Sequence, residues 1–301
     1  MVSYGFRYVT RLQAMKFIKC SLYAIFLILA SGTLIAQERR ALVVGIGQYE
    51  DLSWNEINAD NDLWYVEKVL EMYDFRDVTY LKNENATKAS IVESFQSLIT
   101  RSEKGDVIYV HFSGHGQQVK DLDGDEADGY DESWIPYDAY RRCCAEDDGS
   151  KHLIDDEINT LLSKLRCAVG NEGQILVIVD ACHSGKSSKS GLNEINGFNY
   201  RGVGDIFIPQ CKYEQREIIN EDWLLIAACK DNQVNFEVKK LRVGKLTYSL
   251  YKLREFLPIL SNDGLMRMIN ELMESDAMAS PLPQTPHFDG EQYKVMDVFK
   301  R

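Results

Sequence analysis

The sequence is poor in several features that mark common protein classes. It has 6 prolines in 301 residues, no proline-rich linker and no internal repeat. Basic residues are in deficit, with 34 against 46 acidic residues and a formal net charge of −12, so the chain lacks the basic footprint of general nucleic-acid binding proteins. Apolar residues are plentiful: a 45% hydrophobic content excludes disorder and can supply the core of one large α/β domain or two small ones.

Cysteine is also sparse for a chain of this length. There are 7 cysteines and no CxxC pair, which argues against a disulfide scaffold and against a structural zinc site. The adjacent Cys143 and Cys144 could pair with other thiols, and the sequence does not choose among them. Apart from Cys20 near the amino terminus, the cysteines are Cys143, Cys144, Cys167, Cys182, Cys211 and Cys229.

Several well-known catalytic and binding motifs are absent. No serine stands in a GxSxG elbow, and Gly45-Ile46-Gly47 lacks the third glycine of a dinucleotide loop. Gly185-Lys186-Ser187 resembles the end of a phosphate loop, but Asp180 occupies the position of its first glycine. The run Asp121–Asp125 begins like a calcium hand and fails at its sixth position, where Glu126 replaces glycine.

Residues 1–36 differ in charge from the rest of the chain. They hold four basic residues and no acidic one, so the chain without them would carry a formal charge of −16. Lys16 and Lys19 precede an apolar run at 22–30 and a small residue, Ala36, which predicts a secretory signal and a secreted or periplasmic protein. Met15 is an alternative start. The competing interpretation is an uncleaved membrane anchor, although the apolar run is short against the roughly 20 residues of a span.

The remaining residues, 37–301, are predicted to form a single domain. Apolar runs at Ala41–Gly47, Asp106–Phe112, Gln174–Val179 and Trp223–Cys229 are continuous rather than alternating, as in parallel strands covered on both faces. Helical patterns lie between and after them, at Asp62–Tyr73, after a Thr87 cap, at Asp155–Leu165, Leu246–Leu257 and Leu265–Met273. This alternation predicts a doubly wound α/β fold. Ser184–Gly204, rich in Gly, Ser, Asn and Lys, is predicted to be a loop.

Ligands of an open parallel sheet bind beyond the carboxyl ends of its strands. His115 follows the second predicted strand between two glycines, and Cys182 follows the third. A cysteine or histidine on its own is more often an ordinary packed residue. A thiol and a base at neighbouring strand ends instead favour a catalytic Cys-His dyad, since the thiolate needs a nearby base.

Two segments carry a family resemblance. Phe112-Ser113-Gly114-His115-Gly116 and Asp180-Ala181-Cys182-His183-Ser184-Gly185 resemble the two signatures of the caspase-like cysteine peptidases, in particular the metacaspase branch of the bacterial secreted type. The resemblance covers roughly residues 40 to 260. It includes Asn61-Asp62, the run 125–132, 136–138, 154–157, 227–233 and 246–248.

The resemblance implies a three-layer α/β/α sandwich with a mostly parallel sheet and a peptidase mechanism that needs no cofactor for its chemistry. Cys182 would attack the scissile carbonyl and His115 would transfer the proton to the leaving amine. Backbone N–H groups of Gly116 and Cys182 would stabilise the oxyanion. The sequence offers no third triad residue.

By the same resemblance Asp62, Ser113 and Asp180 would line the S1 pocket. Asp180 lies two residues before Cys182, hence on the same side of the strand. Carboxylates in a pocket pair with cations, so we expect cleavage of peptides or proteins after Arg or Lys. The alternative for Asp180 is a simple cap at the strand end.

The acidic segment Asp121–Glu132 is predicted to be a loop, either merely solvated or a calcium site. Asp131, Asp155 and Asp156 match activating calcium ligands of the family. A further family acid is replaced by Lys189, which weakens the match.

The basic residues of the loop after Cys182, namely Lys186, Lys189 and Arg201, suggest self-processing, with an ordinary surface loop as the alternative. We expect a monomer that contacts no nucleic acid and meets a membrane only through an uncleaved amino-terminal segment. Two other functions compete with this interpretation: a catalytically idle caspase-fold binding module, and a peptidase of the clostripain or gingipain type.

Overall fold

A computed structural model describes residues 37–124, 126–182, 198–211, 213, 222–230, 233–290 and 292–300. From Glu38 onward the chain forms one compact unit. Within the described ranges, no helix combines the length and the apolar character that crossing a bilayer requires. The predicted amino-terminal signal segment lies outside the described residues.

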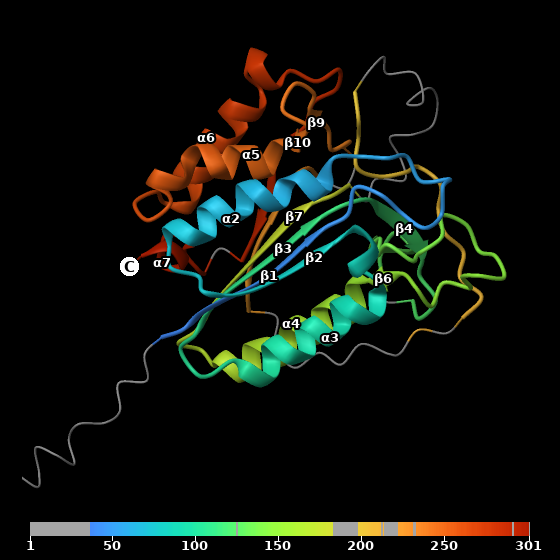
Figure 1. Cartoon of the computed structure of the whole chain (residues 1–301), viewed down its shortest axis with the longest axis horizontal. Helices are drawn as coiled ribbons and strands as arrows, with labels where there is room; N and C mark the ends of the chain where they lie inside the picture. The colour runs from blue at the N-terminus through green and yellow to red at the C-terminus, as the bar shows by residue number, and fades with distance from the viewer. Residues whose placement is uncertain are drawn as a thin grey trace, which may run out of the picture. The chain divides into compact units, whose positions relative to one another are not determined.

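A six-stranded sheet forms the centre of the molecule (Figure 1). Its order is β11-β8-β7-β3-β1-β2, and every neighbouring pair is parallel except β11 with β8. The sheet is therefore mostly parallel, as predicted. Its strands are β1 Arg39–Gly45, β2 Asp77–Lys82, β3 Val107–Ser113, β7 Gln174–Asp180, β8 Leu224–Ala227 and β11 His287–Asp289.

Helices cover both faces of the sheet, because alternate strand residues point to opposite sides. Leu42 and Val44 of β1 pack with Ile91 and Phe95 in the α3 layer. Ala41 and Val43, which alternate with them along the strand, pack on the α2 side. The α/β/α sandwich is thereby confirmed (Figure 1). One layer comprises α2 Asp62–Met72, α5 Lys245–Leu253, α6 Asn262–Met273 and α7 Val295–Phe299, and the other α3 Lys88–Arg101 and α4 Asp155–Val169.

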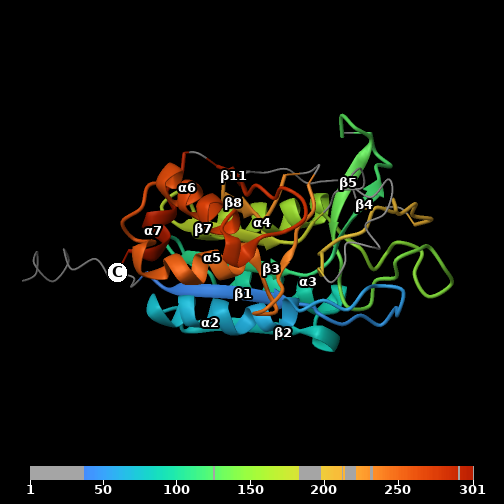
Figure 2. The ribbon, with the colours of Figure 1, turned by 90° about the horizontal axis from the view of Figure 1, so that it is seen from above.

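Two small sheets and short 3-10 helices complete the fold. The larger small sheet lies at the carboxyl end of the central strands (Figure 2). It corrects one prediction: the segment Asp121–Glu132 is not all loop, because its last residues belong to β5. The elements are β4 Gly116–Lys120, β5 Tyr130–Trp134, β6 Leu153–Ile154, β9 Glu237–Val238, β10 Val243–Gly244, η1 Ala59–Asn61, η2 Asn83–Asn85, η4 Arg254–Phe256 and η5 Asp276–Met278.

The predicted strands and helices are confirmed with shifts of a few residues at their ends. Thr87 caps α3 as expected, since its hydroxyl accepts the backbone N–H of Ser90. The predicted helix Leu246–Leu257 is shorter than expected, because α5 gives way to a 3-10 turn after Leu253. β2 went unpredicted because it is an edge strand with half-exposed side chains and no continuous apolar run.

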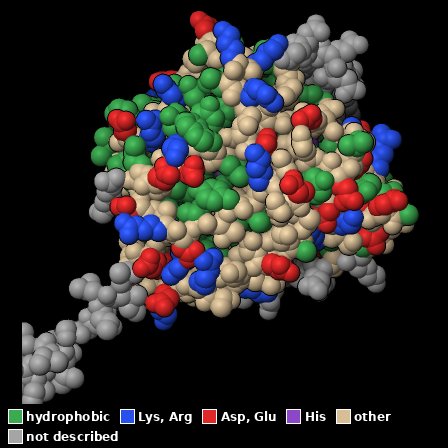
Figure 3. All heavy atoms as spheres, in the orientation of Figure 1, with side chains coloured by type: hydrophobic (Ala, Val, Ile, Leu, Met, Phe, Trp, Pro, Cys, Tyr) green, Lys and Arg blue, Asp and Glu red, His purple; other side chains and the backbone are tan. Residues whose placement is uncertain are grey.

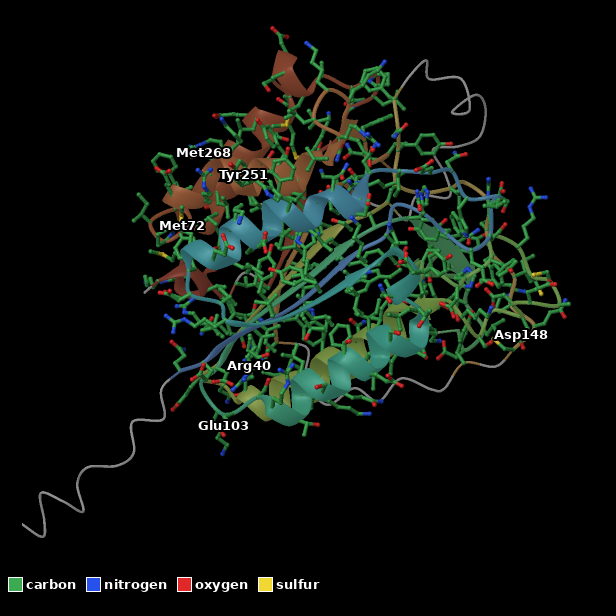
Figure 4. All side chains as sticks on the ribbon, in the orientation of Figure 1. Arg40, Met72, Glu103, Asp148, Tyr251 and Met268 are labelled. Carbon is green, nitrogen blue, oxygen red and sulfur yellow. The ribbon has the colours of Figure 1, made fainter. Side chains whose placement is uncertain are left out.

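The amino ends of the central strands are fixed by ion pairs far from the candidate site. Arg40 of β1 bonds Asp106 at 3.0 Å and Asp77 at 2.5 Å. Figure 4 labels Arg40 and Glu103 at this end of the sheet and Asp148 among the loops at the other end. These ion pairs stabilise the amino ends of the strands, and the candidate site residues lie at the opposite, carboxyl ends.

On the face seen in Figure 3, acidic and basic side chains are interspersed, and hydrophobic side chains gather over the α2–α5–α6 layer. Part of this group is a cluster of aromatic rings: Tyr65 contacts Trp64, Tyr248 and Tyr251 at centroid distances of 4.9 to 5.8 Å. Figure 4 labels Tyr251 and Met268 in this layer, with Met72 at the end of α2. These contacts join α2 to α5 and so fix the position of Asp62 at the start of α2.

Candidate active site

The predicted nucleophile and base lie at the ends of neighbouring strands. In the register of β3 with β7, Ser113 is the Cα partner of Asp180. His115 and Cys182 each follow two residues later, so both leave the sheet at the same place. Both are buried, Cys182 with 3% and His115 with 0% of its surface exposed.

The His115 ring is held by a backbone carbonyl. Its Nε2 lies 2.8 Å from the carbonyl oxygen of Asn55. A carbonyl only accepts hydrogen bonds, so Nε2 carries the proton and Nδ1 is the basic nitrogen. Nδ1 is buried without a hydrogen-bond partner in the part of the chain that the structure describes. Sequence reasoning could not find Asn55, because a backbone carbonyl leaves no motif.

Aromatic side chains enclose the same ring. Trp54 stacks on His115 with centroids 5.1 Å apart, and Tyr49 lies at 5.2 Å. The Tyr49 hydroxyl accepts the backbone N–H of His115 at 2.7 Å. Burial lowers the pKa of His115 to about 4, so its imidazole is neutral at pH 7.

The backbone and thiol of Cys182 both make hydrogen bonds. Its N–H donates to the carbonyl of Arg201 at 2.6 Å, and its Sγ donates to the carbonyl of Gln233 at 3.0 Å. Gly116, the other predicted oxyanion donor, is the first residue of β4, immediately after His115.

The structure brings together the three residues predicted to line S1. Ser113 Oγ donates to Asp62 Oδ2 at 2.8 Å, and Asp180 shares Thr247 with Asp62, since Thr247 Oγ1 lies 2.7 Å from Asp180 Oδ2 and 3.1 Å from Asp62 Oδ2. All three predicted residues are fully buried, with 0% exposed surface. A carboxylate in such a place requires a cation or several donors.

The cation is Arg201. Its guanidinium forms a bidentate pair with Asp62, at 2.6 and 3.0 Å, and lies 3.2 Å from Asp180. A third carboxylate, that of Glu237, accepts hydrogen bonds from Nε and NH2 of the same guanidinium at 3.3 and 3.2 Å. Sequence reasoning named Arg201 only as a basic loop residue, and it missed Glu237, which lies outside both signatures.

The pKa values of Asp62 and Asp180 are shifted in opposite directions. Burial raises the pKa of Asp62, although the attraction of Arg201 opposes the rise. Burial acts in the same direction on Asp180, but Arg201 and hydrogen bonds from Asn235 and Thr247 outweigh it and lower that pKa. Arg201, surrounded by these acids, has its pKa raised well above the usual value. The cluster therefore holds its cation in charged form.

A second set of residues keeps the pocket in shape. His111 Nε2 lies 2.9 Å from Ser113 Oγ, and the hydroxyl oxygen of Tyr109 lies 3.2 Å from His111 Nδ1. Ser113 gives its proton to Asp62, so it accepts from Nε2, and Tyr109 donates to Nδ1. A Cβ on Gly244 would lie 2.2 Å from Asp180 Oδ2 and 2.5 Å from an Arg201 nitrogen, so only glycine leaves room for the guanidinium.

The described cavities lie beside the dyad rather than on it. One, of about 320 Å³, is lined by Glu56, Ile57, Asn58, Asn199, Glu237, Lys239 and Arg242. It adjoins the Arg201 cluster through Glu237. A larger one, of about 410 Å³, touches Ala181 and Cys229 on the α4 side of the sheet and includes neither His115 nor Cys182. The candidate site is the end of β3 and β7, where the predicted residues His115 and Cys182 follow neighbouring strands beside the Arg201 cluster.

The residues matched to calcium ligands form an acidic group at β5 and the start of α4. Burial and the charges of Asp155 and Asp156 raise the pKa of Asp131 to about 8, and burial with Asp156 and Glu126 raises that of Asp155 to about 7. Among the described residues, no group of three or more His, Cys, Asp or Glu side chains has metal-site geometry. Asp155 Oδ1 is buried without a hydrogen-bond partner there, and a buried carboxylate oxygen of this kind is an oxygen donor of the type that calcium prefers. Lys189 lies outside the described residues.

Among the described residues, no two cysteines are joined by a disulfide. The adjacent Cys143 and Cys144 thus form no disulfide with another described cysteine.

Comparison with known proteins identifies the family. The model of the caspase domain matches residues 38–294. The chain belongs to the caspase-like peptidase family. Metacaspase-1B of Aspergillus fumigatus is 37% identical over 160 residues, which cover 49% of this chain and 35% of that protein. Metacaspase-1 of Schizosaccharomyces pombe is 26% identical over 82% of this chain and 66% of its own length.

The chain thus spans between about one third and two thirds of the length of these curated relatives. A solved structure of a Geobacter sulfurreducens protein is 25% identical, covers 84% of this chain and 92% of its own and superposes with a TM-score of 0.61. These relatives confirm the caspase-like, metacaspase-related identity of the fold and the family.

Proposed function

We propose that this protein is a cysteine endopeptidase that cleaves peptide bonds after Arg or Lys. The observation that carries the proposal is the pocket of Asp62, Asp180 and Glu237, which already holds a guanidinium at 2.6 to 3.3 Å two residues from Cys182 along β7. A substrate arginine has the same charge and the same planar donors. An acidic P1 side chain would be repelled by these carboxylates.

In the proposed reaction the Cys182 sulfur forms a bond to the scissile carbonyl carbon as His115 Nδ1 takes the thiol proton. The neutral state of His115, with its proton on Nε2 toward Asn55, leaves Nδ1 free for this role. The backbone N–H of Cys182 would donate to the oxyanion, and its hydrogen bond of 2.6 Å to the Arg201 carbonyl supports this role. The proton then passes to the leaving amine, the C–N bond breaks, and water hydrolyses the thioester.

A P1 scan tests this proposal. Fluorogenic peptides that differ only at P1 should be cleaved fastest with Arg or Lys, and Cys182→Ala should abolish cleavage. A preference for Asp at P1 would refute the specificity. Failure of a basic-P1 electrophile to label Cys182 would favour the idle binding module instead.

We extend the proposal to self-processing after Arg201. Cys182 would attack the Arg201 carbonyl, the bond to Gly202 would break, and hydrolysis would leave a new carboxylate at Arg201. The hydrogen bond of 2.6 Å from Cys182 N–H to that carbonyl supports the choice over Lys186 and Lys189, which lie outside the described residues. Mass spectrometry after incubation should find a fragment that begins at Gly202, and none in Cys182→Ala.

Calcium is the proposed activator. Asp131, Asp155 and Asp156 would hold it, and the ion would neutralise their mutual repulsion without taking part in the bond cleavage. Activity that is equal in excess chelator and in millimolar calcium would refute this role.

We also propose a secreted or periplasmic monomer. The edge strand β11 has only 3 residues, which supports a monomer because a short edge strand offers little surface for pairing with another chain. Sedimentation and the amino-terminal mass of protein recovered from cells test the two proposals separately.

A further inference from the structure

A second thiol, that of Cys229, lies beside the predicted nucleophile. Its Sγ donates to the carbonyl oxygen of Gln233 at 3.6 Å, and Cys182 Sγ donates to the same oxygen at 3.0 Å. The two sulfur atoms can therefore be no further apart than the sum of these two distances. Cys229 Sγ also lies 3.9 Å from the carbonyl oxygen of Ala181, the residue that precedes Cys182.

The backbone places the two cysteines at a separation that a disulfide can span. β7 and β8 pair in parallel up to Val179, and the N–H of Ala228 donates to the Val179 carbonyl at 2.9 Å. This ladder sets Cys229 level with Ala181, one residue before Cys182. A strand spacing of about 4.8 Å and a rise of about 3.3 Å put the two Cα atoms about 6 Å apart. Disulfides join Cα atoms that are about 4.4 to 6.8 Å apart.

The two side chains converge although they follow different strands. β7 ends at Asp180 and β8 at Ala227, so both cysteines lie beyond the strict alternation of side chains inside a strand. The shared acceptor shows that both thiols point into the same space. Both are buried, Cys182 with 3% and Cys229 with 7% of its surface exposed. A disulfide would then require a change of rotamer rather than of the backbone.

The shared acceptor is itself held in place. The N–H of Gln233 donates to the Lys230 carbonyl at 2.9 Å, and Gln233 Oε1 accepts the N–H of Thr285 at 2.7 Å. Gln233 Nε2 donates to Thr285 Oγ1 at 3.2 Å. These bonds keep the two thiols at one fixed carbonyl. The alternative, a cysteine that only fills the core at position 229, does not account for the shared acceptor.

A small reagent can reach the pair from the α4 side of the sheet. The cavity of about 410 Å³ is lined by Ala181 and Cys229 among other residues. A hydrogen peroxide molecule is only slightly larger than water, so this cavity admits it. The thiol pair is therefore accessible to a small oxidant although both sulfur atoms are buried.

We propose that Cys182 and Cys229 form a reversible oxidation site, at which a hydroperoxide converts the two thiols into a disulfide. With hydrogen peroxide, the Cys182 sulfur attacks one peroxide oxygen as its proton passes to His115. The O–O bond breaks, water leaves with that proton, and Cys182 becomes a sulfenic acid. The Cys229 sulfur then attacks the Cys182 sulfur, the S–O bond breaks, and a second water leaves with the Cys229 proton. The two thiols lose two electrons in all, and the peroxide gains them.

The disulfide would both stop cleavage and protect the nucleophile. A bonded Cys182 cannot attack a peptide. A sulfenic acid that has no second thiol nearby is oxidised further to a sulfinic acid, which thiol reductants do not reverse. The formation of the disulfide does not depend on the proposed function, whereas the loss of cleavage rests on it.

Peptide mass spectrometry of the full chain tests the bond. The protein is treated with hydrogen peroxide, alkylated and digested with trypsin without reductant. The tryptic peptides 167–186 and 217–230 should then be found linked, about 2 Da lighter than the two separate peptides, and dithiothreitol should release them. Fragment ions should place the bond at Cys182 rather than at Cys167, which lies on the same peptide.

A variant tests the protection. Reduced Cys229→Ser should cleave a peptide with arginine at P1 at the wild-type rate. After peroxide, dithiothreitol should restore about tenfold more activity to the wild type than to this variant, whose Cys182 should gain about 32 Da as a sulfinic acid. Cys211→Ser is the matched control, because Cys211 is a half-buried cysteine whose N–H bonds the Asp148 carbonyl, away from Cys182. It should recover like the wild type.

The outcomes separate the inference from the proposed function. If oxidised wild-type protein carries a sulfinic acid at Cys182 and no link to Cys229, the inference is wrong. It is also wrong if Cys229→Ser recovers as fully as the wild type. Cleavage after arginine by the reduced protein would leave the proposed function standing in both cases. If the reduced protein cleaves no basic peptide, the proposed function fails, and the linked peptide alone decides the inference, as it does if Cys229→Ser does not fold.

Discussion

Replacement of Asp62 by Asn should remove most of the preference for arginine at P1. In the structure Asp62 is the best-placed carboxylate for a guanidinium, with two hydrogen bonds at 2.6 and 3.0 Å to Arg201. Hydrogen bonds to charged groups contribute roughly 1.5 to 3 kcal/mol each. The amide keeps one acceptor oxygen, so the expected loss is that of one bond, about 1.5 to 3 kcal/mol, or about 13- to 160-fold.

The ratio of kcat/KM for a P1-Arg peptide to that for a P1-Gln peptide is the quantity to measure. Any segment that occludes the cleft affects both peptides equally, so the ratio reports the pocket alone. Asp60→Asn is the matched control: this acid lies two residues away, loses the same charge, and pairs with Lys82 near the surface rather than with Arg201. A ratio for Asp62→Asn within threefold of the wild-type value would refute the assignment of S1.

Three further predictions concern the pocket acid Glu237, the ring of His115 and the acidic group of Asp131 and Asp155. Glu237→Gln should lower the Arg-over-Lys ratio of kcat/KM about tenfold, because Glu237 bonds the Nε and NH2 atoms that lysine lacks; an unchanged ratio would exclude Glu237 from the pocket. The pKa of His115 is lowered from 6.5 to about 4, so the unfolded state takes up a proton at a higher pH than the folded state does. The free energy of unfolding should therefore fall by up to about 3 kcal/mol as the pH is lowered from 6.5 to 4. Urea unfolding should find a smaller fall in His115→Gln. Calcium should raise the Tm strongly at pH 8.5 and much less at pH 6, because Asp131 and Asp155 are protonated below their pKa values of about 8 and 7. Asp131→Asn should lose this effect of calcium, and the control Asp148→Asn, at an exposed acid, should keep it.

The sequence predicts the central strands well because they depend on a local pattern, and the dyad proposed from it stays a prediction. Continuous apolar runs mark buried parallel strands, and the carboxyl ends of such strands meet at one edge. The period of two residues along a strand correctly places Asp180 beside the Cys182 end. The edge strand β2 has no such pattern, since its side chains are half exposed.

The parts that sequence reasoning missed are those made by contacts between distant residues. The carbonyl of Asn55 contacts His115, which lies 60 residues away in the sequence, and Glu237 contacts Arg201, which lies 36 residues away. Neither contact leaves a trace in spacing or composition. The role of Arg201 was missed for the same reason: its charge was visible, but its burial depends on the fold of the whole chain.

The register of β3 with β7 has a consequence for how such a pocket can change. The predicted pocket acid Asp180 is the last residue of β7 and the predicted nucleophile Cys182 follows it by two positions, and Ser113 and His115 stand in the same relation at the end of β3. A pocket built from loops can be remodelled by insertions. Here one inserted residue between Asp180 and Cys182 would advance the thiol by about 3.3 Å and turn it to the opposite face. New substrate preferences at this site are therefore accessible through substitution alone, and the chain length between recognition and chemistry is fixed.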